Sequence, residues 1–487
     1  MTNFEPRMST SRICLATIYF LIAVGGLRAE AAAKPNVLFI AIDDLNDWVG
    51  FLDGHPQAKT PNMDRLAKRG VVFSNAHCQA PICNPSRVSL MTGTLPSTTG
   101  IYLLGPTDFR KACPLLADKK KTPTLPEHFA ANGYRTIGGG KIYHGATSRD
   151  TFQEYGPRGG NGAFPKQKLN YPTGVKLWDW GKFPARDEDQ GDYGVATWAV
   201  EELAEPREEP FFMAVGFFRP HVPLYASDKW WKFVGAEDDI QLPKILASDN
   251  DDIVDFARKL TWSGLAPRHD WMADNDQWKP AVHAYLACVS FVDHQVGRVL
   301  DALEASAHAE NTIVVLWSDH GWALGEKRRW AKRGLWEAET RVPLIIAGPN
   351  VEGGRVCDQP AGLIDIYPTL ADLCGLSKPS HLEGRSLTPQ LANVDTERPP
   401  VITTFFENNH AVRSTRWRYI RYSTGDEELY DHDSDPHEWH NLADGFQHAA
   451  VIKELSQHLP TVNARTAPGS SGLGSRPEDR HLFGNVK

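Results

Sequence analysis

Two continuous apolar runs of strand length stand out along the chain. They cover residues 36–42 and 312–318, and each is followed directly by two polar residues. Uninterrupted apolar runs of this length are typical of central parallel strands, because such strands are buried on both faces of the sheet. The pattern therefore predicts two strands in the middle of a sheet.

Four more segments have the length and apolar content of strands, and one long segment has a helical period. The further strands are expected at residues 71–77, 134–137, 211–218 and 342–347. In residues 279–305 apolar side chains recur every three or four positions, as in a helix that covers one face of a sheet. Strands that alternate with helices indicate a largely parallel α/β sheet.

The C-terminal part of the chain has a different pattern. After Pro399 and Pro400, alternating runs at 401–406 and 417–422 predict a small antiparallel sheet, and a helical pattern follows near 448–458. We therefore expect a large domain, a smaller α+β domain and a mobile tail rich in Gly, Ser and Pro, at residues 34–392, 393–464 and 465–487.

Two aromatic stretches rich in Gly and Pro, at 146–192 and 229–280, lack a long clean period. They are interpreted as insertions that either wall a substrate pocket or serve as scaffolding. The 15 tryptophans of the chain also allow two interpretations: they form surfaces on which sugars stack, or they belong to the core. The core is the commoner place for aromatic residues.

The N-terminus has the pattern of a signal peptide over residues 1–31. Two arginines precede an apolar stretch at 13–27, and Ala29-Glu30-Ala31 forms a small-x-small cleavage signal. A membrane anchor is the alternative, but the apolar stretch is shorter than the roughly 20 residues of a spanning helix. We expect an exported protein, periplasmic or extracellular, without stable membrane insertion.

Composition narrows the function only slightly. A net charge of −8 over 487 residues gives no indication of nucleic-acid binding, so any anionic ligand must be bound by a local cluster of cations. Six cysteines remain after residue 31, without the CxxC pairs or Cys/His spacing of zinc sites. Neither a zinc site nor a disulfide scaffold is predicted.

Cys83 lies between a predicted strand and a helix expected to begin near Pro85. The partial positive charge at a helix N-terminus favours an anionic nucleophile or an anionic substrate group. From the residues alone, Cys83 is either a nucleophile or an inert buried cysteine, and inert is the commoner case.

The segment Cys83-Asn84-Pro85-Ser86-Arg87, followed by Thr92-Gly93, resembles the signature of the formylglycine-dependent (type I) sulfatases. Motif order and spacing along the mature chain are most similar to the iduronate-2-sulfatase-like branch. The resemblance implies an alkaline-phosphatase-like α/β domain with a mostly parallel sheet flanked by helices, and a smaller C-terminal domain with an antiparallel sheet.

The resemblance also implies a reaction. A maturation enzyme oxidises Cys83 to formylglycine, whose aldehyde hydrates to a geminal diol. One hydroxyl attacks sulfur and the other later expels sulfate, so water need not attack a second anionic ester.

Asp43, Asp44, Asp319 and His320 follow the two central strands, where ligands of open α/β sheets gather. Alone, an aspartate pair after a strand is most often a cap or turn. The resemblance implies that one Ca²⁺ ion bridges these four residues, the formylglycine at Cys83 and the sulfate. Imidazole is a poorer calcium ligand than oxygen. The resemblance therefore implies that a metal is present, but His320 leaves the identity of the metal open.

Two further motifs place titratable side chains on loops. Lys141 and His144 resemble the Gly-Lys-x-x-His element of the family, and His221 resembles its Pro-His-x-Pro loop. By resemblance, Lys141 binds sulfate, His144 bonds to the formylglycine hydroxyl, and His221 protonates the leaving alcohol. Each motif alone would favour a surface lysine or a structural histidine.

Lys332 resembles a sulfate-binding lysine of the family, and with Arg87 it would stabilise charge on the transferring group. Four more cations surround it: Lys327, Arg328, Arg329 and Arg333. They form either a solvated face or a recognition site for a carboxylate or further sulfates.

The predicted function is hydrolysis of a sulfate ester on a carbohydrate, such as a uronate or another sugar derived from a polysaccharide. Two alternatives stay open at this point. One is a phosphate or phosphonate monoester hydrolase on the same scaffold, because the tetrahedral anions are alike. The other is an inactive protein that binds sulfated glycans and keeps an unmodified thiol.

Overall fold

The computed structural model describes residues 1–3, 5, 34–145, 149–172, 177–261 and 266–470. The predicted signal peptide therefore lies almost entirely outside the described residues. Within these ranges no helix is long and apolar enough to cross a membrane. The six described cysteines are all buried, and none forms a disulfide with another described residue.

An eight-stranded mixed sheet forms the centre of the fold, in the order β13-β2-β12-β9-β1-β7-β4-β5. Its strands are β1 (Asn36–Asp43), β2 (Gly70–Phe73), β4 (Arg135–Gly140), β5 (Glu154–Tyr155), β7 (Phe211–Pro220), β9 (Thr312–Ser318), β12 (Leu344–Ala347) and β13 (Arg355–Cys357). All pairings are parallel except those of β12, which runs antiparallel to β9 and β2. The two apolar runs are neighbours, because β1 pairs with β9.

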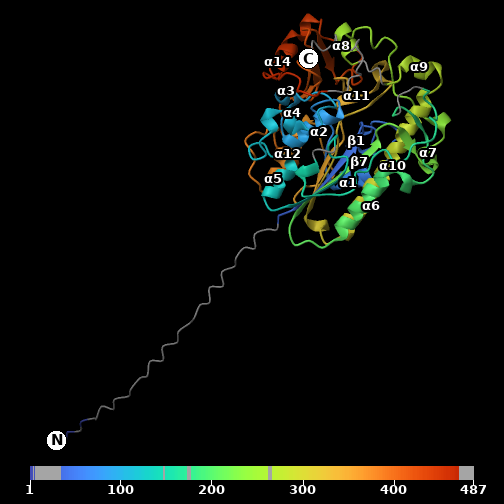
Figure 1. Ribbon diagram of the computed structural model, residues 1–487. Helices are drawn as coiled ribbons and strands as arrows, with labels where there is room; N and C mark the ends of the chain where they lie inside the picture. Colours follow the sequence, from blue (N-terminus) through green and yellow to red (C-terminus); the bar gives the residue numbers. More distant parts are fainter. Residues whose placement is uncertain (4, 6–33, 146–148, 173–176, 262–265, 471–487) are drawn as a thin grey trace. The chain divides into compact units, whose positions relative to one another are not determined.

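Helices cover both faces of this sheet. One face is covered by α1 (Pro61–Arg69), α6 (Gly191–Ala204), α7 (Asp228–Val234) and α10 (Trp278–Ala305), the other by α2 (Cys83–Thr92), α5 (Leu125–Ala131) and α12 (Ile366–Leu373) (Figure 1). The alternation along β1 explains both layers: Leu38 and Ile40 belong to one apolar core, whereas Val37 and Phe39 belong to the other. The expected α/β architecture is confirmed.

Shorter elements connect these layers. The helices are α3 (Pro96–Thr99), α4 (Phe109–Ala112), α8 (Asp255–Leu260), α9 (His269–Asp274), α11 (Glu337–Thr340) and α13 (Thr388–Ala392). The strands, each in a two-stranded sheet, are β3 (Ala76–His77) with β14 (Ala361–Gly362), β6 (Trp180–Lys182) with β8 (Leu224–Ala226), and β10 (Ala323–Leu324) with β11 (Trp330–Ala331).

The C-terminal region contains the predicted antiparallel sheet. Its strands, paired in sequence order, are β15 (Val401–Thr404), β16 (His410–Arg413), β17 (Trp417–Arg421) and β18 (Glu427–Asp431), and helix α14 (Ala449–Ser456) follows. Ile420 and Tyr430 share an apolar cluster with residues of the main sheet's loops, whereas Tyr419 and Leu429 pack toward α14. The sheet is thus covered on both faces. The start of the expected mobile tail is anchored, because Ala467 is buried and its N–H donates to the Gly100 carbonyl.

The aromatic insertions contribute to the core. Trp178, Trp180, Trp230 and Trp231 are each at most 9% exposed and belong to the apolar cluster around α10. Scaffolding is therefore the interpretation that the structure favours for these tryptophans.

The N-terminus of helix α1 is capped by a side chain of α10, a helix on the same face of the sheet. Asp293 on α10 accepts hydrogen bonds from the backbone N–H groups of Asn62 and Met63, at 3.2 and 2.9 Å, and Asp293 is 1% exposed. We expect Asp293→Ala to lower the free energy of unfolding by about 2 kcal/mol, because the α1 amides lose their acceptor in a buried place.

Urea denaturation measures this effect. Asp301→Ala is the matched control, because Asp301 lies on the same helix and pairs with Arg65 of α1, but its side chain is 66% exposed. The control should change stability by less than about 0.5 kcal/mol. Equal effects of both substitutions would show that Asp293 is not a cap.

Candidate active site

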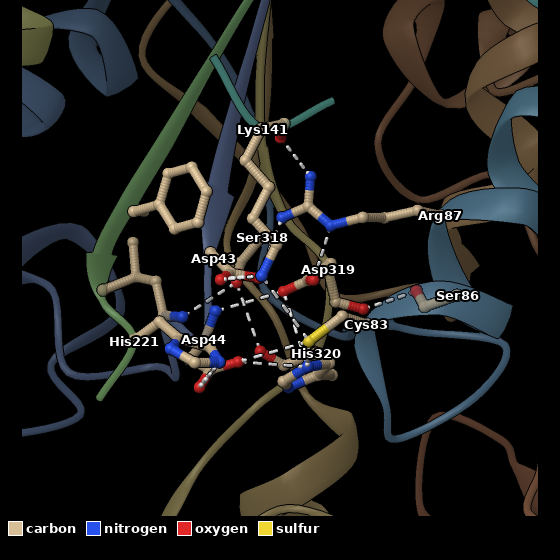
Figure 2. Close-up of polar contacts among 12 residues, drawn as sticks. Asp43, Asp44, Cys83, Ser86, Arg87, Lys141, His221, Ser318, Asp319 and His320 are labelled. Carbon is tan, nitrogen blue, oxygen red and sulfur yellow. Dashed lines mark hydrogen bonds and ion pairs between the residues drawn. The ribbon is translucent and has the colours of Figure 1, made fainter. Parts of the chain in front are cut away.

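The ends of four parallel strands bring the predicted residues to one edge of the sheet. Asp43 is the last residue of β1, and Asp319, Lys141 and His221 directly follow β9, β4 and β7. These strands are neighbours and run parallel, so their carboxyl ends meet. Figure 2 shows the side chains converging there with Cys83, which opens helix α2.

Cys83 is fully buried at the first position of α2. Its Sγ lies 2.9 Å from Lys332 Nζ, 3.3 Å from His320 Nε2, 3.8 Å from Asp44 Oδ1 and 3.9 Å from Lys141 Nζ. Burial raises the pKa of the Cys83 thiol, although the two lysines oppose this effect. An unmodified Cys83 is therefore a poor thiolate nucleophile.

Arg87 joins the helix to the strand ends. It is fully buried, its Nε donates to Asp319 Oδ2 at 2.7 Å, and its Nη2 donates to Asp43 Oδ1 at 3.1 Å. Its Nη1 donates to the carbonyls of Lys141 and Ile142. One side chain thus binds groups at the ends of β1, β9 and β4, which a lysine could not do with its single nitrogen.

Asp44 has an unusual backbone for a non-glycine residue, with φ of 60°. Its carbonyl accepts a hydrogen bond from Tyr285 Oη at 2.8 Å, and its N–H donates to Asp319 Oδ1 at 3.1 Å. Its Oδ1 lies 2.7 Å from Lys332 Nζ, whereas its Oδ2 is buried without a hydrogen-bond partner. Burial raises the pKa of Asp44 to about 8.

The histidines at the site are held in the neutral form. Burial lowers the pKa of His320 and lowers that of His221 well below its usual value. Nδ1 of His320 lies 2.9 Å from the Gly321 carbonyl, and Nδ1 of His221 lies 2.6 Å from the Val222 carbonyl. A carbonyl only accepts, so both Nδ1 atoms carry the proton and both Nε2 atoms present a lone pair.

His144 is the predicted site residue with the least support from direct contacts. Its Nδ1 is buried without a hydrogen-bond partner, and burial together with the charge of Lys141 lowers its pKa to about 3. That electrostatic effect places His144 near the site, but the described contacts do not join it to Cys83.

Of the three groups of described side chains that have the geometry to hold a metal ion, two lie at this edge of the sheet. One is Asp43, Asp44, Cys83 and His221, and the other is Cys83, Asp319 and His320; within each group the ligand atoms lie within 4.8 Å of one another. The unpartnered Oδ2 of Asp44 is a carboxylate oxygen of the kind that hard divalent cations bind. These residues fit a divalent cation.

The extra cations near Lys332 are largely engaged within the chain. Lys327 pairs with Asp249, Arg328 with Asp270 and Arg329 with Glu339. The structure therefore favours structural roles for these three residues over recognition of a second anionic group.

Sequence reasoning missed the residues that support the site. Tyr285, on α10, bonds to the Asp44 carbonyl and accepts from the Asn46 N–H at 2.9 Å, and no local motif marks it. The Trp322 ring lies 5.4 Å from Lys332 Nζ, and its only sequence signal is its position two residues after His320.

Comparison with known proteins shows which family this chain matches. Residues 35–376 match the family model described as Sulfatase, and residues 325–465 match that of the N-sulphoglucosamine sulphohydrolase C-terminal region. A sulfatase of Formosa agariphila is 43% identical over 88% of this chain and 87% of its own length. The iduronate 2-sulfatase of Homo sapiens is 30% identical over 82% of each chain. The solved structure of a 2-O GAG sulfatase has a TM-score of 0.69 at 25% identity and covers 87% of this chain and 90% of its own.

Because Arg87 is buried between two aspartates, its replacement should destabilise the folded protein. We expect Arg87→Ala to lower the free energy of unfolding by about 3–5 kcal/mol, because Asp43 and Asp319 lose a buried counter-ion. Thermal and urea unfolding measure the loss. Arg65→Ala, which removes an arginine whose side chain is 36% exposed, is the control and should cost less than about 1 kcal/mol. A stability change as small as that of the control would contradict the role of Arg87 as an organising residue.

Proposed function

The chain belongs to the sulfatase family, as the Cys83 motif predicted, and we propose that it hydrolyses a sulfate ester of a carbohydrate with a formylglycine made from Cys83. The observation that carries this proposal is the position of Cys83. Cys83 is the first residue of helix α2 and is fully buried. The ammonium groups of Lys332 and Lys141 lie 2.9 and 3.9 Å from its Sγ. A nucleophile there faces cations that suit a sulfuryl group.

The unmodified thiol does not supply the chemistry, since burial raises its pKa. The hydrated aldehyde of formylglycine would supply one hydroxyl to attack sulfur and a second to release sulfate. We propose that Lys332 and Lys141 bind the sulfate oxygens and that His144, near Lys141, accepts the proton of the second hydroxyl. Arg87 adds positive charge and fixes Asp43 and Asp319.

His221 would act as the acid for the leaving alcohol. Its Nε2 lies 3.8 Å from Asp44 Oδ2, and it must be protonated there before it can donate. Burial and the nearby charges of Lys141 and Lys332 lower the pKa of His221. A bound sulfate ester carries a negative charge that offsets both lysines, so substrate binding itself should favour the protonated histidine.

We propose that Asp43, Asp44, Asp319 and His320 hold one Ca²⁺ ion, with the modified residue 83. The ion would supply positive charge that polarises an oxygen of the sulfate. Arg87, Lys141 and Lys332 already pair with the three aspartates of this set. His320 presents an unprotonated Nε2, as a metal ligand must, and its Nδ1 bonds to a backbone carbonyl.

The substrate class rests on the relatives. By their names, iduronate 2-sulfatase acts on a sulfated iduronate and the 2-O GAG sulfatase acts on a sulfated glycosaminoglycan. We propose a sulfated polysaccharide fragment, with a uronate sulfate as the first sugar to test. The N-terminal pattern supports export, and a formylglycine-generating enzyme would be the maturation partner.

Maturation of Cys83 is the first test. From the native host, or from co-production with a formylglycine-generating enzyme, the tryptic peptide of residues 70–87 should be lighter by the difference between cysteine and formylglycine. Cys83→Ala should reduce sulfate release about a thousandfold or more, because the nucleophile is lost. Cys78→Ala is the matched control, since Cys78 is also fully buried and lies in the same peptide; it should be modified at position 83 and active.

Other outcomes select the alternatives. An unmodified Cys83 under these conditions would contradict the mechanism. Faster turnover of an aryl phosphate than of an aryl sulfate would identify a phosphate monoester hydrolase. A protein that binds sulfated glycans equally well before and after Cys83→Ala, and releases sulfate in neither form, would be a binding protein.

Calcium should stabilise the folded protein. We expect Ca²⁺ to raise the Tm of chelator-treated protein, because binding to the native state alone shifts the unfolding equilibrium by mass action. Asp44→Asn should abolish the shift, whereas Asp301→Asn, far more exposed, should leave it intact. Differential scanning fluorimetry measures both. A Tm shift that survives Asp44→Asn would place the calcium ion elsewhere.

A further inference from the structure

Lys332 reaches the site from a segment, residues 327–337, whose backbone needs outside support. Lys327, Arg328, Ala331 and Arg333 have φ values of 50°, 53°, 83° and 90°, in the left-handed region that non-glycine residues rarely adopt. The segment's only strand, β11, pairs with β10 over two residues. Such a backbone persists only when the surrounding structure holds it.

Glu438 holds both ends of this segment. Its carbonyl accepts a hydrogen bond from Lys327 Nζ at one end, and its carboxylate accepts one from the Glu337 N–H, at 2.7 Å, at the other. Glu438 is 1% exposed, and more than a hundred residues separate it from both partners. A single residue therefore ties together the two ends of the chain segment that carries Lys332.

The C-terminal sheet holds Glu438 in turn. Arg418, on β17, is fully buried, pairs with the carboxylates of Glu438 and Glu337, and donates to the Leu335 carbonyl at 2.9 Å. His432 Nε2 lies 3.0 Å from Glu438 Oε1. The carboxylates of Glu438 and Glu337 lie with Arg418 between the small sheet and the segment. One face of the small sheet therefore contacts this segment.

We propose that Glu438 is a positioning residue for Lys332, and that the C-terminal sheet thereby completes the active site. The proposal rests on the proposed role of Lys332 in binding sulfate. Lys332 Nζ must lie 2.9 Å from residue 83 and 2.7 Å from Asp44 Oδ1, and a shift of about 1 Å in a catalytic group can lower a rate a hundredfold.

Inorganic sulfate is the probe, as a competitive inhibitor of the matured enzyme. Glu438→Gln keeps the size of the side chain but weakens its bonds to Arg418 and to the Glu337 N–H. We expect the inhibition constant for sulfate to rise about tenfold or more, and kcat/KM for hydrolysis of the sulfate ester to fall by a similar factor. Lys332→Ala should give the same changes.

The double variant identifies the route of the effect. If Glu438 acts through Lys332, Glu438→Gln should change nothing further in the Lys332→Ala enzyme. Leu429→Ala is the matched control: Leu429 is buried on the opposite face of the same sheet. It should lower the Tm but leave the inhibition constant unchanged.

Three results decide the matter. A lower Tm with an unchanged inhibition constant in Glu438→Gln, or additive effects in the double variant, would overturn the proposal. If Lys332→Ala alone left sulfate inhibition unchanged in matured enzyme, the proposed function of Lys332 would be wrong instead. Should Glu438→Gln not fold, Glu438→Asp, which keeps the charge but shortens the side chain, carries the same comparison.

Discussion

The buried pairing of Arg87 with Asp43 and Asp319 is the interaction on which the rest of the site depends. All three side chains are fully buried, and they come from the start of α2 and the ends of two central strands. Charges in such a place are tolerated only when they are paired and hydrogen-bonded, so the geometry of each partner restricts the others. The same pairing fixes the start of α2 against the sheet and therefore also the position of Cys83.

The charges explain why the site suits an anionic ester. Each of the three central cations is paired with an aspartate, and burial keeps the neighbouring histidines neutral. A negatively charged substrate and a divalent cation would bring opposite charges to the centre of the site. Their binding would be mutually favourable, because each offsets the charge that the other brings.

The small C-terminal sheet belongs to the same structural unit as the site. Arg418 of this sheet and Glu438, which follows its last strand, both bond to the segment of Lys332, which lies some hundred residues before Glu438 in the chain. These contacts cross the domain boundary near residue 392 that the change in sequence pattern predicts.

The sequence by itself determined the central strands, the helix over residues 279–305, the small sheet and the family to which the chain belongs. Continuous apolar runs and short spaced motifs are local, and they can be read without knowing what packs against them. Only the tertiary structure decided that Tyr285 supports Asp44, that Glu438 ties the ends of the Lys332 segment, and that most of the extra cations are paired. Apart from the pairing of Arg329 with Glu339, these contacts join residues more than fifty positions apart. Hydrogen bonds across such separations leave no pattern in the sequence.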